Sequence, residues 1–130
     1  MRVETETHQM VTPPRNGLLH IIDAAGYSLA GLRRLWAETA ARLEVMGAVL
    51  AALGLLAKGA ELWQWCAAAG LFALVLAVEA LNTAIEVLTD HISPEWSVMA
   101  RDAKDLGSLA VGLILVVASG FVLAVLCGVL

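Results

Sequence analysis

Four polar side chains interrupt one apolar stretch of this chain at helical spacing. Glu79, Asn82, Glu86 and Asp90 follow one another at intervals of three, four and four residues. Such intervals place side chains on one face of an α-helix, here within an arc of about 80° at 100° per residue. Carboxylates on one face of an apolar helix require a divalent metal, a neighbouring Lys or Arg, or a bound proton to compensate their charge.

The free-energy cost of placing these acids in a membrane helix indicates that they have a function. An acid at the centre of a membrane helix costs roughly 2.5–3.5 kcal/mol on insertion scales. Interhelical hydrogen bonds, the purely structural alternative, contribute about 0.6 kcal/mol on average, which is too little to offset buried carboxylates. We therefore interpret the four residues as part of a functional site.

The apolar composition determines where such a helix lies. The chain has 130 residues, of which 60% are hydrophobic and 15% charged, whereas soluble domains have about 25% charged residues. Three uncharged stretches, 45–57, 62–78 and 106–130, are candidates for crossing a bilayer, which takes roughly 20 apolar residues. The net charge of −4 and the lack of a basic cluster argue against nucleic acid binding.

We predict an all-α membrane protein with an N-terminal amphipathic surface helix and three transmembrane helices. The surface helix should cover about 18–39, because apolar residues recur there in steps of four and three with polar residues opposite. The transmembrane helices should cover about 40–57, 62–91 and 104–129, with Pro94 preventing continuation of the second. Residues 1–16 should form a disordered tail that precedes a single domain of residues 17–130.

The distribution of basic residues predicts the topology. Arg33 and Arg34 precede the first span, and Arg101 and Lys104 lie between the second and third, whereas the first hairpin has only Lys58. Because cytoplasmic loops carry an excess of Lys and Arg, the amino end should be cytoplasmic.

Small residues open the third span. Gly107, Ser108, Ala110 and Gly112 follow the charged residues there, so a neighbouring helix can approach closely. The charges at Arg101 and Asp102 are best interpreted as a solvated rim at headgroup level.

From the residues alone, a metal-binding membrane site is indicated but a kinase is not. The sequence has neither a Gly-x-x-x-x-Gly-Lys-Ser/Thr loop nor a protein-kinase signature. Cys66 and Cys127 have no metal ligands at suitable spacing and are assigned no chemistry.

Several motifs together resemble the prokaryotic diacylglycerol kinase family. They are Glu-Ala-Leu-Asn-Thr-Ala-Ile-Glu-Val-Leu-Thr-Asp at 79–90, Ala-Lys-Asp-Leu-Gly-Ser at 103–108, Ala-Ala-Gly-Tyr-Ser at 24–28, and Gly-Leu-Arg at 31–33 with Trp36. The resemblance runs from Gly17 to the end of the chain. It implies a small homotrimeric enzyme of the bacterial cytoplasmic (inner) membrane, which uses ATP to phosphorylate diacylglycerol to phosphatidic acid at the cytoplasmic surface.

The resemblance also implies roles for individual residues. Glu79 would be the catalytic base, Asn82 would orient the reacting groups, and Glu38 and Glu86 would bind Mg²⁺. The residues expected to contact the nucleotide are His20, Tyr27, Glu38, Glu86, Asp90, Glu95, Trp96, Ser97, Lys104 and Asp105. Those expected to contact the lipid are Ala24, Ala25, Gly26, Ser28, Leu29, Arg33, Glu79 and Ser108.

The sequence departs from the family pattern at two places on the surface helix. His20 stands where the family usually has arginine. Between Trp36 and Glu38 the chain is one residue shorter than the usual pattern, which on a continuous helix turns later residues by about 100°. Glu38 then reaches the metal only if the helix bends nearby, and Glu44 is the alternative ligand.

Two other functions compete with diacylglycerol phosphorylation. An undecaprenol kinase of the same fold would act on another long-chain alcohol. A small proton-coupled transporter would use Glu79 to bind and release protons, but such proteins are commonly built from repeats, which this sequence lacks. In either kinase, one chain offers too few partners to enclose the polar face, so we expect neighbouring subunits to complete each site.

Overall fold

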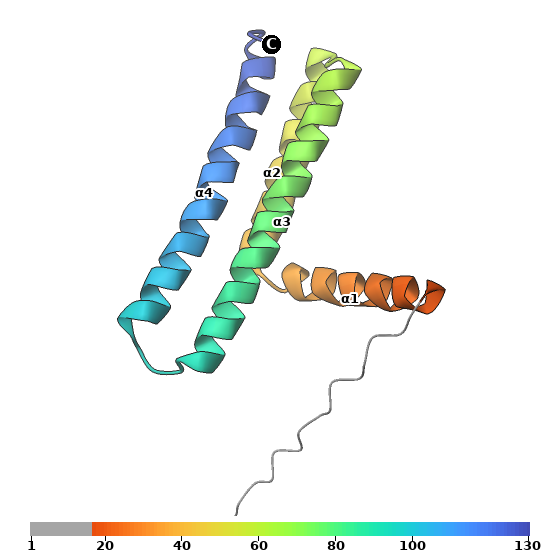
Figure 1. Cartoon of the computed structure of the whole chain (residues 1–130). Helices are drawn as coiled ribbons and strands as arrows, with labels where there is room; N and C mark the ends of the chain where they lie inside the picture. Colours follow the sequence, from red (N-terminus) through yellow and green to blue (C-terminus); the bar gives the residue numbers. More distant parts are fainter. Residues whose placement is uncertain (1–16) are drawn as a thin grey trace, which may run out of the picture.

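The computed structural model describes residues 17–130, which form four helices and, within that range, no strand (Figure 1). The helices are α1 (Leu18–Trp36), α2 (Thr39–Lys58), α3 (Leu62–Ile92) and α4 (Val98–Leu126). In this part of the chain, α2, α3 and α4 are each long and apolar enough to cross a membrane. The predicted all-α membrane fold is therefore confirmed, whereas the predicted tail, residues 1–16, lies outside the described residues.

The fourth helix begins earlier than predicted, at Val98 instead of residue 104. Ser97 starts it, because the Ser97 hydroxyl accepts a hydrogen bond from the backbone N–H of Ala100 at 3.1 Å. The third helix ends at Ile92, two residues before Pro94, as the ring of proline requires. The connection is thus a short loop, and the charged residues 101–105 lie on α4.

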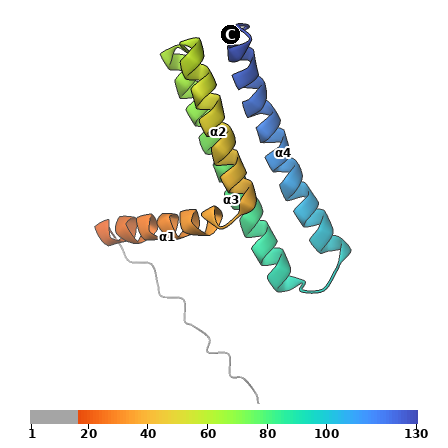
Figure 2. The same cartoon turned by 180° about the vertical axis from the view of Figure 1, so that it is seen from behind.

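The surface helix is also shorter than predicted, because it ends at Trp36 and not at residue 39. Glu38 has extended backbone angles, φ −77° and ψ 136°, and precedes the first residue of α2. The chain turns there, so α1 leads away sideways from the lower end of α2, while α3 and α4 continue below it (Figure 2). Leu35 is buried at this junction, whereas Leu29 and Leu32 are exposed, as expected for a helix whose apolar side meets lipid.

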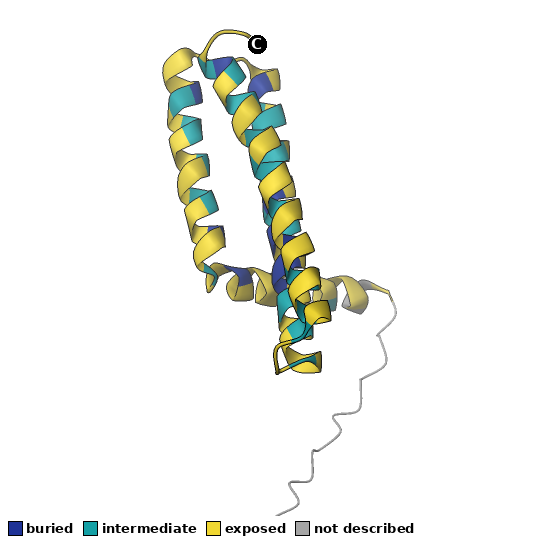
Figure 3. Cartoon of the chain, turned by 90° about the vertical axis from the view of Figure 1, so that its left-hand side faces the viewer, coloured by how far each residue is buried: buried dark blue, intermediate teal, exposed yellow. Residues whose placement is uncertain are grey.

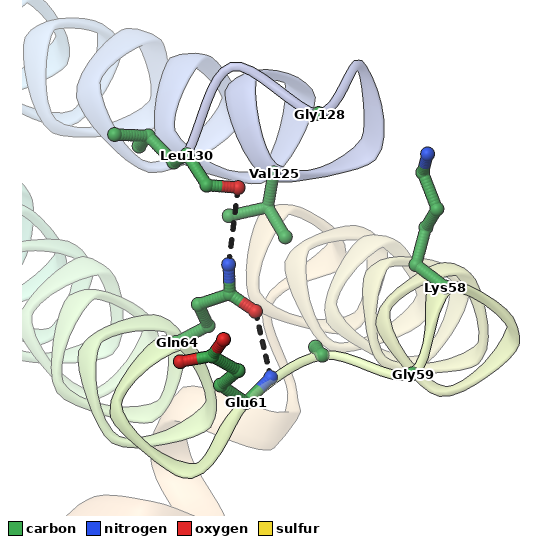
Figure 4. Close-up of a pocket in the computed structure, with 8 residues that line it drawn as sticks. Lys58, Gly59, Glu61, Gln64, Val125, Gly128 and Leu130 are labelled. Atoms are coloured by element: carbon green, nitrogen blue, oxygen red, sulfur yellow. Dashed lines mark hydrogen bonds between the residues drawn. The ribbon is translucent and has the colours of Figure 1, made fainter.

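A tight hairpin joins α2 to α3 at the opposite end of the bundle. Gly59 adopts the left-handed conformation at φ 68°, and Glu61 and Gln64 form a capping box. The buried Gln64 side chain accepts from the Glu61 N–H at 2.7 Å and donates to the Leu130 carbonyl at 3.1 Å (Figure 4). One side chain therefore ties the hairpin to the carboxyl end of α4, beside a cavity of about 220 Å³.

Most side chains of the long helices are exposed in the isolated chain (Figure 3). Burial is confined to positions where helices face one another, such as Leu55 on α2, Val75 on α3 and Val125 on α4. The most extensive pairing is between α3 and α4. Exposed leucines and valines elsewhere on the spans suit a protein whose surface is covered by lipid or by other subunits.

Candidate active site

The polar face of α3 becomes progressively more exposed toward its carboxyl end. Glu79 is 4% exposed and Asn82 8%, Glu86 is half-buried, and Asp90 is exposed. The Asn82 amide donates to Glu86 Oε1 at 3.2 Å, so two members of the face contact each other directly. The residues predicted from their spacing thus do share one face of a single helix.

The length of α3 places this face near one membrane surface. The helix has 31 residues and is therefore about 46 Å long at 1.5 Å per residue, whereas the hydrocarbon core is about 30 Å thick. Glu79 lies about 26 Å along the axis from Leu62. With Leu62 placed at the opposite edge of the hydrocarbon layer, Glu79 lies near the other edge, and the residues from Asn82 to Asp90 extend toward the headgroups.

Two acids from outside α3 lie near Glu79. The charges of Glu38, at the start of α2, and Glu86 both act on Glu79, and the charge of Glu79 acts on Glu44 of α2. Glu38 forms an ion pair with Arg34, whereas the ion pairs found within residues 17–130 include neither Glu44, Glu79 nor Glu86. Glu79 is therefore close enough to interact with three other carboxylates, of which Glu38 is paired with a cation.

Two oxygen atoms without hydrogen-bond partners belong to residues of this same acidic region. Glu44 Oε2 and Asn82 Oδ1 are buried without a hydrogen-bond partner. Leaving a buried acceptor unpaired costs about 1–3 kcal/mol, so such atoms commonly indicate a missing ligand, ion or water.

The donor set suits magnesium brought by a phosphate ligand better than a preformed metal cage. No group of three or more His, Cys, Asp or Glu residues between 17 and 130 is arranged to hold an ion. Magnesium typically binds through one or two carboxylates together with phosphate oxygens and water. Glu38 and Glu86 could supply those carboxylates, with Glu44 as a further oxygen donor.

A polar cavity of about 330 Å³ opens where α3, the short loop and α4 meet. The ammonium group of Lys104 lies 2.5 Å from Asp90 Oδ1 at its edge. Six residues predicted to contact the nucleotide line this cavity: Asp90, Glu95, Trp96, Ser97, Lys104 and Asp105.

The remaining predicted residues are not brought to this cavity within one chain. His20 and Tyr27 are exposed on α1, which contacts α2 and α3 but makes no contact with α4. Ser108 is exposed on α4. The predicted lipid contacts on α1 are all exposed as well: Ala24, Ala25, Gly26, Ser28, Leu29 and Arg33.

Two features of the site escaped the sequence reasoning. Thr83 is only 7% exposed beside the polar face, and an isolated threonine in an apolar helix has no spacing that would single it out. The close approach of Gly107 was predicted, but its partner, the side chain of Asn82, was not. A contact between two helices cannot be derived from the spacing within either one.

The fold and the site together define a small polytopic membrane protein with an acidic site near one membrane surface. The prokaryotic diacylglycerol kinase family matches residues 26–126. A diacylglycerol kinase of a Sinorhizobium species is 46% identical over 106 residues, which is 82% of this chain and 77% of the relative. The diacylglycerol kinase of Escherichia coli K12 is 38% identical over 103 residues, covering 78% and 84%. That of Pseudomonas aeruginosa is 35% identical over 98 residues, covering 74% and 79%.

The chain therefore belongs to the prokaryotic diacylglycerol kinase family. This membership confirms the resemblance noted in the sequence and makes the chain a lipid kinase. Together with the three apolar helices, it also makes the protein a multi-pass membrane enzyme.

Proposed function

We propose that this protein transfers the γ-phosphate of ATP to diacylglycerol and forms phosphatidic acid at the cytoplasmic membrane surface. The observation that carries the proposal is the nearly buried Glu79 carboxylate, 4% exposed, at the edge of the hydrocarbon layer. At that depth a lipid hydroxyl and a soluble nucleotide can meet. The names of the relatives support diacylglycerol as the acceptor.

Glu79 acts as the general base in this proposal. It accepts the proton of the lipid hydroxyl as the hydroxyl oxygen forms a bond to the γ-phosphorus. The bond between that phosphorus and the bridging oxygen breaks, and ADP leaves with the bond's electron pair. A carboxylate in an apolar setting is poorly solvated, which favours its uptake of a proton.

Asn82 and two acids hold the reacting groups. Asn82 fixes the Glu86 carboxylate through the 3.2 Å hydrogen bond. Glu86 and Glu38 would bind Mg²⁺, which neutralises phosphate charge during transfer. The break in the helix beside Glu38 supports its place in this set, because the extended backbone there removes the constraint of a continuous helix.

The 330 Å³ cavity beside Lys104 is the proposed nucleotide site. Lys104 and Arg101 line it and supply positive charge, and the exposed Trp96 offers an aromatic face. An ammonium group favours phosphate binding electrostatically. His20 and Tyr27 would reach the nucleotide from another subunit.

The direction of α1 supports a homotrimer with shared sites. This helix leads away from its own bundle (Figure 1). The residues on it that are predicted to contact lipid are therefore exposed and lie away from the α3–α4 cavity of their own subunit. In an assembly, α1 of one subunit can lie against the site of the next. The amino end and the α3–α4 loop would face the cytoplasm of a bacterial inner membrane, in keeping with the basic residues there.

A transfer assay with two acceptors tests the proposal. Purified protein in mixed micelles would receive γ-labelled ATP and magnesium, with diacylglycerol or undecaprenol at equal mole fraction. We expect labelled phosphatidic acid to form faster than labelled undecaprenyl phosphate, and chelation of magnesium to stop both reactions. Faster phosphorylation of undecaprenol would overturn the assigned acceptor, and no transfer to either lipid would overturn the kinase proposal.

A further inference from the structure

The side chain of Asn82 lies between α3 and α4, with a hydrogen bond on α3 and a close steric approach to α4. Its amide nitrogen donates to Glu86 Oε1 at 3.2 Å, while its carbonyl oxygen points at the backbone of Gly107 on α4. A Cβ atom at Gly107 would lie 2.2 Å from Asn82 Oδ1. Real Cβ atoms essentially never approach another heavy atom so closely, so with any other residue at position 107 the Asn82 carbonyl would have to move.

We propose that Gly107 is a positioning residue, whose missing side chain forms the hollow that receives the Asn82 carbonyl and so directs the Asn82 amide toward Glu86. The inference deepens the proposed function, on which it rests for its effect on turnover. Gly107 itself touches no reacting atom. It acts on the site only through the orientation of Asn82.

A methyl group at Gly107 would require either the Asn82 side chain or helix α4 to move. Asn82 is 8% exposed, and its carbonyl would have to rotate away from Gly107 to make room for a methyl group. If it did rotate, its hydrogen bond to Glu86 would break. If α4 moved away instead, the Lys104–Asp90 ion pair on the same two helices would have to lengthen.

The other glycines of α4 show that this hollow is local. A Cβ atom at Gly112 or Gly120 would have no non-local heavy atom within 4 Å. Alanine at those positions adds the same methyl group to the same helix and shares any general effect on helix stability. Gly112→Ala is therefore the matched control for Gly107→Ala.

The side-chain amide of Asn82 can be observed directly, without an activity assay. The chain has two asparagines, Asn16 and Asn82, so ¹⁵N-asparagine labelling gives two side-chain NH₂ groups in an NMR spectrum. The Asn82→Ser variant identifies the signal of Asn82. We expect Gly107→Ala to shift this signal and Gly112→Ala to leave it in place. An unchanged Asn82 signal in folded Gly107→Ala protein would overturn the proposal.

Turnover provides the second measurement. Gly107→Ala should lower kcat at least tenfold and change the KM for diacylglycerol less than twofold, while Gly112→Ala should match the parent in both. A fall in kcat without a shift of the Asn82 signal would contradict positioning through Asn82. If the parent protein phosphorylates no lipid, the kinase proposal fails, whereas the NMR comparison still tests the contact.

A double variant covers the case in which Gly107→Ala does not fold. Alanine at position 82 ends at Cβ, which lies 3.8 Å from a Cβ at Gly107, an ordinary van der Waals distance. Asn82→Ala combined with Gly107→Ala should therefore fold and unfold at the same temperature as Asn82→Ala alone. A double variant that also fails to fold would show that the methyl group clashes with something other than Asn82, and would overturn the proposal.

Discussion

The Lys104 ammonium group lies 2.5 Å from Asp90 Oδ1 and joins the start of α4 to the end of α3. The two residues are separated by the loop of residues 93–97 and face each other at the edge of the 330 Å³ cavity. In the proposed function, Asp90 would hold the ammonium group in place for a phosphate. The pair therefore defines both the geometry and the charge of the proposed nucleotide site.

Removal of the Lys104 charge should weaken nucleotide binding. Hydrogen bonds to charged groups contribute about 1.5–3 kcal/mol, so Lys104→Met should raise the KM for ATP by roughly 10- to 100-fold. Lys58→Met, at the opposite end of the bundle, is the control and should leave the KM unchanged. Initial rates over a range of ATP concentrations provide the measurement, and an unchanged KM in Lys104→Met would remove Lys104 from the site.

Loss of the Arg34–Glu38 ion pair should make magnesium easier to bind. The pair is exposed, with 53% and 32% of the two side chains accessible, and such pairs contribute about 0.2–1 kcal/mol. Arg34→Gln releases Glu38, so the magnesium concentration for half-maximal activity should fall by up to about fivefold. A rise in that concentration would mean that Arg34 orients Glu38 and does not compete with the metal.

Shared sites can be detected by mixing inactive subunits. Tyr27 is on α1, away from the α3–α4 cavity, whereas Glu38 and Glu79 lie near each other in one chain. Co-reconstitution of Tyr27→Ala with Glu79→Gln should therefore restore activity, with about a quarter of randomly formed interfaces carrying both intact residues. The mixture of Glu38→Gln with Glu79→Gln should stay inactive. Activity in the second mixture alone would reverse this assignment of residues to chains.

The two hydrogen bonds of the Gln64 side chain, at the hairpin between α2 and α3, should affect the stability of the fold and not the rate of phosphate transfer. Gln64→Leu removes both hydrogen bonds of the capping side chain and should destabilise the fold by about 1–2 kcal/mol. Thermal unfolding in detergent should show the loss, while the KM values for ATP and diacylglycerol stay the same. Lys58→Ala, in the same hairpin, is the control. A changed KM in Gln64→Leu would show that this end of the bundle is coupled to the site.

The sequence predicted what depends on local periodicity and composition. Three apolar stretches and one amphipathic stretch were sufficient for the four helices, and the spacing of Glu79, Asn82, Glu86 and Asp90 was sufficient to place them on one face. These properties follow from helix geometry within one segment. The structure confirms them directly.

Contacts between different helices could not be predicted from the periodicity and composition of single segments. The hydrogen bond that caps α4 at Ser97 lets the helix begin at Val98, before the predicted residue 104. A single serine is only a weak sequence signal for the start of a helix. The Gly107–Asn82 contact depends on how α3 and α4 rotate against each other, which no spacing within one helix determines. The family resemblance, rather than physical reasoning, supplied the role of Glu38 and the nucleotide.

We propose that the nearly buried carboxylate of Glu79 accepts the proton of the lipid hydroxyl. Glu79→Gln keeps the size of the side chain and removes the base, and Glu61→Gln makes the same change at the opposite end of the protein. The most direct test is the rate of transfer from labelled ATP to diacylglycerol by these two variants at saturating magnesium. We predict a fall of about 10²- to 10⁴-fold in kcat for Glu79→Gln and parental turnover for Glu61→Gln. Parental turnover in Glu79→Gln would contradict the account.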